Sequence, residues 1–184
     1  LKGSVHIRRY ECAPTELTAL FPYRTDSEQV ELISAARLAR DYPGAWAYLR
    51  ACRTLLEQRE RGKWKHERWY AYGRSQALSA VQLPKLLTPS IARWGSFVVD
   101  GKGDYFLAGS GGGGGGGYGI LLGNDAVISM LFLCGLLDSS LLNWLLRTVS
   151  TPFRGGYYAY NRQFIERLPV RVPDMTAKGG RACH

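Results

Sequence analysis

Basic and aromatic side chains alternate between residues 50 and 74. This window holds eight Lys or Arg residues against three Glu, so it carries +5 of the chain's net charge of +9. Its aromatic members are Trp64, Trp69, Tyr70 and Tyr72. Basic side chains bind phosphates and aromatic rings stack on bases, so this pattern is typical of nucleic-acid contact. The alternative is a solvated helix face whose aromatic side chains pack inward, and we expect Trp69 and Tyr70 to be core or loop anchors.

A run of seven glycines occupies positions 111–117. Together with Ala108-Gly109-Ser110 it resembles the loop in which amino-methyltransferases bind S-adenosylmethionine. That loop leads from a strand into a helix, whereas here a predicted strand, Tyr118–Leu122, follows. The chain also has no Asn-Pro-Pro-Tyr or Asp-Pro-Pro-Tyr sequence to hold a target amine. The run therefore indicates a flexible hairpin loop, or a backbone that approaches DNA phosphates, and a divergent complete methyltransferase using Gly109–Gly117 remains a rival.

Other catalytic and metal-binding patterns are missing from the sequence. It has no G-x-S-x-G and no H-E-x-x-H, and the glycine run lacks the Lys-Ser or Lys-Thr that ends a P-loop. Asp100, Lys102 and Asp104 are close in sequence, but a turn there favours solvated residues over magnesium ligands. The four cysteines and three histidines show no zinc-site spacing, which indicates a reduced, cytoplasmic protein. We predict no catalytic, cofactor-binding or metal-binding residue in this segment.

Short helices and strands must position these residues. Pro43-Gly44 open a helix that we extend to about Arg61, where Gly62 ends it. A short strand is predicted at Glu31–Ile33, and Ser34 caps a helical turn through Arg40. Four residues at helical spacing should form the core side of the longer helix: Trp46, Leu49, Cys52 and Leu56.

The pattern becomes β-like after Pro84 and helical again after residue 124. An apolar helix is predicted from Asp125 to Leu137, buried nearly all round. A second helix, Leu141–Val149, should follow a cap at Asp138-Ser139-Ser140 and direct Leu141, Leu142, Trp144 and Leu145 inward. The Asp100–Gly103 stretch predicts a hairpin. The predicted strands are Lys85–Thr88, Ser96–Asp100, Asp104–Ala108 and Tyr118–Leu122.

The composition sets limits on the class of protein. The chain has 184 residues, 46% hydrophobic and 21% charged, which excludes a disordered tail. Its longest apolar run, 126–137, is 12 residues long, against the roughly 20 of a spanning helix. The basic surplus favours nucleic acid as partner, with an acidic membrane surface as the main rival. Because the chain begins at Leu1 without a signal-peptide pattern, we expect a piece of a longer polypeptide.

Seven segments, read in order, carry a resemblance to one family. The chain resembles the TaqI-like C-terminal specificity domain, the target-recognition domain of adenine-specific type II restriction-modification DNA methyltransferases. The resemblance covers roughly residues 20–172, and it departs at Asp138, where the family more often has Asn before Ser139. A helix cap would accept either residue. The segments are Phe21–Arg24, Asp41–Leu49 with Leu55 and Arg59, Trp69-Tyr70 with Gly73–Gln76, Pro84–Pro89, Asp100-Gly101 with Tyr105, Leu136–Ser139, and Arg154–Tyr158 leading to Leu168–Val170.

The resemblance implies a mixed α/β (α+β) domain, with a small, mostly antiparallel sheet, a buried helix pair and an N-terminal basic helix. It would bind double-stranded DNA around a target adenine, downstream of a methyltransferase domain of the same chain. S-adenosylmethionine would then bind the parent protein and not this segment, with magnesium needed only if the parent also cleaves. A specificity subunit of a multi-subunit (type I) restriction system is an alternative. We assign residues 1–20 to an extension or linker, 21–172 to the recognition domain and 173–184 to a flexible tail.

Residue types then suggest which side chains contact DNA. Arg pairs with guanine, and Gln or Asn pairs with adenine. The base-reading candidates in apparent loops are Arg74, Gln76, Arg154, Asn161 and Arg162. The phosphate-contacting candidates are Arg53, Arg61, Lys63, Lys65 and Lys85.

Overall fold

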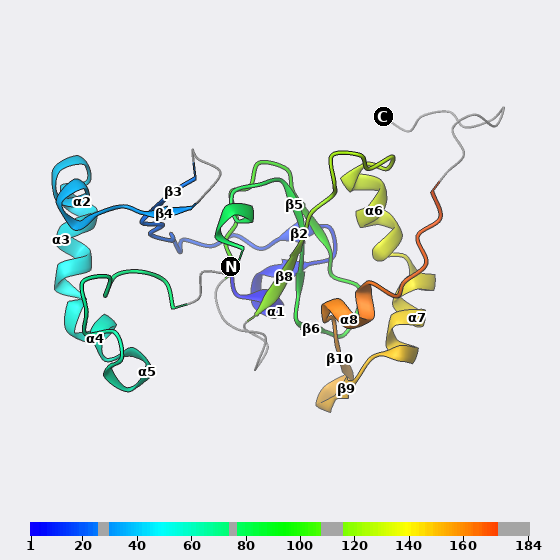
Figure 1. The fold of residues 1–184 in the computed structure, drawn as a ribbon. Coiled ribbons are helices and arrows are strands. Elements are labelled where there is room, and N and C mark those ends of the chain that lie inside the picture. The colour runs from blue at the N-terminus through cyan, green and yellow to red at the C-terminus, as the bar shows by residue number, and fades with distance from the viewer. Residues whose placement is uncertain (26–29, 74–76, 108–115, 173–184) are drawn as a thin grey trace. The chain divides into compact units, whose positions relative to one another are not determined.

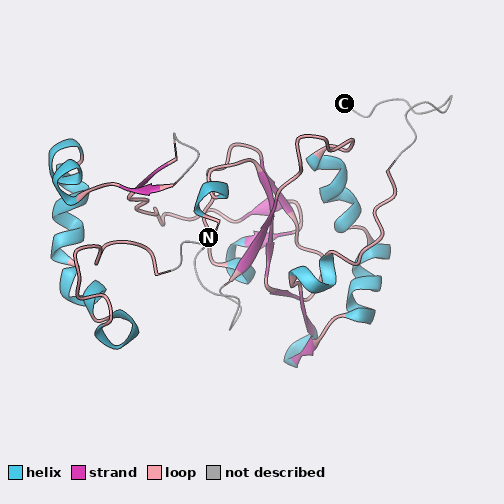
Figure 2. Cartoon of the chain, in the orientation of Figure 1, coloured by secondary structure: helices cyan, strands magenta, loops and turns pink. Residues whose placement is uncertain are grey.

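Helices and small antiparallel sheets make up the chain, as predicted for a mixed α+β fold (Figure 1, Figure 2). The computed structural model describes residues 1–25, 30–73, 77–107 and 116–172. These residues separate into two units, one made of Leu1–Leu17 with the chain from Val81 onward, and one made of Thr18–Ala80. We call them unit 1 and unit 2. Of residues 1–20, assigned from sequence to an extension, residues 1–17 belong to unit 1.

A strand buried along its whole length organises unit 1. This strand, β5 (Lys85–Pro89), lies between β7 (Val98–Asp100) and β8 (Gly117–Ile120) in an antiparallel sheet. Successive side chains of a strand point to opposite faces. Leu86 accordingly belongs to the main core with the helices that follow β8, whereas Leu87 packs with Ile7 of the N-terminal segment. Cover on both faces explains why every residue of β5 is buried.

The other elements of unit 1 surround this sheet. Helices α6 (Met130–Leu137) and α7 (Ser140–Val149) supply five of the ten buried residues of the main core. A second antiparallel sheet has the order β6 (Ile91–Ala92), β10 (Tyr157–Ala159), β9 (Pro152–Phe153). The short elements are α1 (Gly3–His6), β1 (Ile7–Arg8), β2 (Glu11–Cys12), the 3₁₀ turn η2 (Arg154–Gly156) and α8 (Arg162–Ile165).

Unit 2 is mainly helical. Its core consists of Leu38, Leu49, Trp69 and Tyr70. The helix predicted from Pro43 to Arg61 is present but broken twice, at Cys52 and Gln58. Its elements are β3 (Tyr23–Arg24), β4 (Glu31–Leu32), α2 (Ala35–Asp41), α3 (Pro43–Ala51), α4 (Arg53–Glu57), α5 (Arg59–Gly62) and η1 (Leu78–Ala80).

The predicted burial of the apolar helix is wrong. Helix α6 begins at Met130, where the Ser129 hydroxyl accepts the Phe132 N–H at 3.1 Å. It buries Leu133, Cys134 and Leu137 against the sheet, but Leu131 on the other side is 73% exposed. A helix that packs on one layer only must expose its far side, whatever residues stand there.

The prediction of which face of α7 is buried is also wrong. Leu142 and Leu146, one helical turn apart, are the buried residues of α7. Leu141 and Trp144, predicted to face inward, are 70% and 64% exposed. Among the described residues, no single helix is long and apolar enough to span a membrane, although α6 and α7, bent by 63°, reach the required length and composition as a pair.

The predicted hairpin at residues 100–103 is wrong as well. Residues 104–107 form no strand. The Asp100 carboxylate instead accepts the backbone N–H groups of Asp104 and Tyr105, at 2.9 and 3.1 Å. These bonds engage the N–H groups of residues 104 and 105, which are then not available to pair with β7.

Candidate nucleic-acid interface

One arginine of the basic window in unit 2 is a structural anchor. Arg59 donates hydrogen bonds to the carbonyls of Leu56, Trp69 and Ala71 at 2.8, 2.7 and 3.0 Å. Its guanidinium also lies 4.3 Å from the centre of the Trp64 ring. The residue therefore joins the end of α4 to the segment 64–71, and three of its five N–H donors are used inside the unit.

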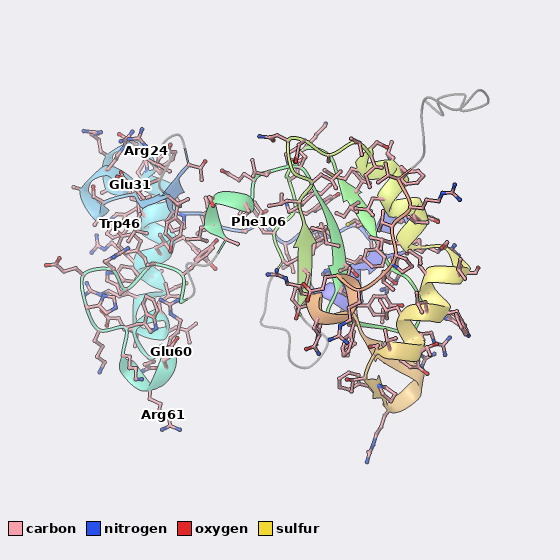
Figure 3. The ribbon with its side chains drawn as sticks, turned by 45° about the vertical axis from the view of Figure 1, so that its right-hand side comes forward. Arg24, Glu31, Trp46, Glu60, Arg61 and Phe106 are labelled. Carbon is pink, nitrogen blue, oxygen red and sulfur yellow. The ribbon has the colours of Figure 1, made fainter. Side chains whose placement is uncertain are left out.

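The chain reverses direction immediately after this anchor. Glu60, Arg61 and Gly62 have φ values of 49°, 63° and 85°, the left-handed region. Glu60 and Arg61 carry a side chain, and the left-handed conformation costs about 1–2 kcal/mol for each of them. The turn exposes Arg61, which points away from α5 (Figure 3), and Lys63 and Lys65 beyond it. Three phosphate candidates thus lie exposed within five residues.

Arg53 is exposed but restrained. Its Nε donates to the Glu57 carboxylate at 2.7 Å, and its guanidinium lies 5.3 Å from the Trp69 ring centre. Trp69 and Tyr70 are buried, and the Tyr70 hydroxyl donates to the Ile33 carbonyl at 2.8 Å. The prediction that these two rings are core residues is confirmed, and they do not form an open stacking platform.

A cavity of about 530 Å³ opens beside the same segment. Its rings include Tyr23, Trp64, His66 and Tyr72. Trp64 and His66 have ring centres 5.3 Å apart, and His66 Nδ1 accepts the Arg68 backbone N–H at 3.1 Å. When neutral, His66 therefore carries its proton on Nε2 and can donate there. Aromatic walls with donors suit a planar, hydrogen-bonding group. The full lining is Tyr23, Val30, Trp64, His66, Arg68, Ala71, Tyr72, Gly73, Ala77, Leu78 and Ser79.

Lys85 does not lie where a phosphate contact requires it. Its side chain is 6% exposed, and its ammonium pairs with Asp100 at 2.7 Å. It also donates to the carbonyls of Val81 and Leu83 at 2.7 and 3.2 Å. The ammonium thus has three acceptors within unit 1, which uses its three protons. This residue stabilises the end of β5, and we remove it from the phosphate candidates.

Three base-reading candidates lie in unit 1. Arg154 is exposed in η2, at the turn of the β9–β10 hairpin. Asn161 precedes α8 without capping it, and its Oδ1 accepts the Tyr118 hydroxyl at 3.3 Å. Arg162 is 88% exposed and pairs with Glu166 at 3.1 Å. Of these three described candidates, Arg154 is the exposed one without an ion-pair or hydrogen-bond partner.

Two further arginines of unit 1 are stacked on aromatic rings, and our sequence analysis did not select them. The Arg147 guanidinium lies 4.9 Å from the Trp94 ring centre and 4.7 Å from that of Tyr158. The Arg93 guanidinium lies 5.0 Å from the Tyr157 ring centre. The adjacent Arg93-Trp94 pair is a basic-aromatic signal of the same kind as the window at 50–74, but α7 and β10 come together with it only in the folded chain.

Asp138 is a buried acid that does not cap the following helix. That cap is Ser139, whose hydroxyl accepts the Leu142 N–H at 3.2 Å. The Asp138 carboxylate accepts the Phe97 N–H at 3.1 and 3.3 Å, and its carbonyl accepts from Arg9 at 2.7 Å. Burial raises the pKa of Asp138 to about 6. The hydrogen bonds of Asp138 connect Phe97, the residue before β7, with the junction of α6 and α7.

Two of the predicted sites lie outside the described residues. These are the base-reading candidates Arg74 and Gln76, and residues 108–115 with most of the glycine run. Within the described ranges, no group of three His, Cys, Asp or Glu side chains could hold a metal ion.

A comparison with known proteins gives a relationship. No family model matches the chain. Over 162 residues, 85% of the chain, it is 26% identical to the type II restriction enzyme and methyltransferase RM.Eco57I of Escherichia coli. The chain is related to a restriction-modification enzyme. It spans 16% of the length of RM.Eco57I.

Proposed function

We propose that this chain is the DNA sequence-recognition part of a restriction-modification adenine-N6 methyltransferase. The observation that carries the proposal is the exposed group of cations at Arg61, Lys63 and Lys65, held by the left-handed turn of unit 2. The relationship to RM.Eco57I, which is named a restriction enzyme and methyltransferase, supports DNA as the partner. Neutralising phosphates with such cations supplies sequence-independent affinity.

The rest of the activity belongs to the parent protein under this proposal. A methyltransferase domain preceding this segment would bind S-adenosylmethionine and the target adenine, flipped from the stack. Magnesium would be required there if the parent also cleaves DNA. The segment itself would contribute affinity and the choice of sequence, in the bacterial cytoplasm.

Salt-dependent binding of the chain to duplex DNA tests this role. Lys63→Gln should weaken binding to every sequence alike and lower the slope of log K against log salt by about one. Arg40→Gln is the matched control, because Arg40 is an exposed cation of the same unit already paired with Asp41 at 2.6 Å. The control should leave the slope unchanged. A wild-type chain that does not bind duplex DNA at low salt would overturn the proposed function.

Base reading needs a different readout. Selection from a randomised duplex library should show a preferred sequence for the wild-type chain. Arg74→Ala, Gln76→Ala or Arg154→Ala should relax one position of it, at a cost of about 1–3 kcal/mol for the lost base contact. If all three variants keep the full preference, these residues do not read bases.

A further inference from the structure

The stacked arginines of unit 1 form one surface with the β9–β10 hairpin. Arg93 and Trp94 follow β6, which pairs with β10 through Ala92 and Tyr158. Arg147 reaches the same ring of Tyr158 from α7. At the hairpin turn, a Cβ added to Gly155 would lie 3.7 Å from Arg93 Nη2. Residues from β6, α7 and the hairpin are thus side by side.

These arginines carry charge that no carboxylate neutralises. Within the described ranges, Arg93, Arg147 and Arg154 form no ion pair with an acid, whereas Arg37, Arg53 and Arg162 each pair with a carboxylate four residues away. The guanidinium carbons of Arg93 and Arg147 lie within 5.0 Å of aromatic ring centres. A cation–π contact restrains a guanidinium without consuming its hydrogen-bond donors.

Exposed aromatic surface surrounds the charges. Trp94 is 62% exposed and Phe153, beside Arg154 at the hairpin turn, is 49% exposed. Gly155 and Gly156 have φ values of 76° and 75°, which allow a narrow turn. Large exposed rings are expensive to solvate, so their presence among unneutralised cations indicates contact with an anionic, partly apolar ligand.

We infer that this surface, comprising Arg93, Trp94, Arg147, Phe153 and Arg154, is a second contact with duplex DNA. Arg93 and Arg147 would each donate to a backbone phosphate, for which a planar fork is well suited. Trp94 would orient the Arg147 guanidinium, Phe153 would lie against sugar and base edges, and Arg154 at the hairpin turn would approach a groove. This inference rests on the proposed function and adds to the cations of unit 2 a site that they do not include.

Two single substitutions, each made in the whole chain, test the phosphate contacts. Arg93→Gln and Arg147→Gln should each weaken duplex binding about tenfold at 0.1 M salt, equally for preferred and unrelated sequences. Each should also lower the salt slope by about one. The matched control is Arg8→Gln, which removes an exposed cation of the same unit that donates to the Ser4 and Ile7 carbonyls. Arg8→Gln should change neither quantity.

Two more variants test the role of stacking. Arg147→Lys keeps the charge but not the planar fork, so it should retain the salt slope and lose only a few-fold in affinity. Trp94→Leu should weaken binding when Arg147 is present and add little when Arg147→Gln is already made, because the ring acts by orienting the guanidinium. Circular dichroism and the thermal midpoint establish that each variant is folded.

The outcomes distinguish this inference from the function on which it rests. If Lys63→Gln weakens binding while Arg93→Gln and Arg147→Gln do not, the unit 1 surface is not a DNA contact and the proposed function stands. If the wild-type chain binds no duplex, the function itself fails. If both arginine variants lose binding only to vesicles containing phosphatidylserine, the surface binds a membrane, and the inference is overturned.

Discussion

The two units differ in how their Lys and Arg side chains are paired. In unit 2, Arg59 is bound to three backbone carbonyls and Arg53 to a carboxylate, whereas Arg61, Lys63 and Lys65 are exposed. In unit 1, Lys85 is buried in an ion pair, yet Arg93 and Arg147 are stacked on rings and keep their charge. Counting Lys and Arg therefore does not measure the charge that a partner meets.

The largest predicted effect concerns the buried pair of unit 1. Lys85→Met leaves the Asp100 carboxylate buried without its cation, so the free energy of unfolding should fall by about 3–5 kcal/mol. The double variant with Asp100→Asn should recover part of this loss, because no uncompensated charge remains. Denaturant unfolding measures both. A loss below 1 kcal/mol would show that Asp100 is already well solvated in the native state.

The equivalent experiment in unit 2 removes its anchor. Arg59→Gln breaks charge-assisted bonds to three carbonyls and the contact with Trp64, and we expect a loss of about 2–3 kcal/mol. Hydrogen exchange of peptides from each unit locates the effect, since protection should fall within residues 30–73 and not in β5. Lys65→Gln is the control for charge alone and should leave protection unchanged. Equal loss of protection in both units would contradict their separate stabilisation.

The smallest expected effect depends on pH. Burial raises the pKa of Asp138 to about 6 from 3.8, so its protonated form is favoured in the folded state. Its contribution to stability is therefore complete below pH 3.8 and is lost as the pH rises through 6. Asp138→Asn should be nearly neutral at pH 4 and stabilising at pH 7, by on the order of 2 kcal/mol. Urea unfolding at the two pH values measures the difference, and equal effects at both would refute the raised pKa.

Local signals in the sequence predicted many elements correctly. Ser34 and Ser139 cap helices as expected, because a hydroxyl before a helix satisfies an N–H wherever it occurs. Apolar runs bounded by turn residues predicted β5 and β7, although β7 is shorter than expected. The core side of α3, with Leu49 buried, follows from helical periodicity. Each depends on neighbours in sequence and needs no knowledge of the rest of the fold.

What the sequence by itself determined is the class of fold, the positions of most helices, the strands β4, β5, β7 and β8, and the basic window as a place of exposed cations. Tertiary structure alone decided which of those charges remain available. Lys85 is paired with Asp100, fifteen residues away, and Arg147 contacts rings from β10 and from the segment after β6. The exposed side of α6 was likewise decided by how many layers cover that helix. The physical reason is that burial and pairing are properties of contacts between distant segments, and periodicity within one segment does not contain them.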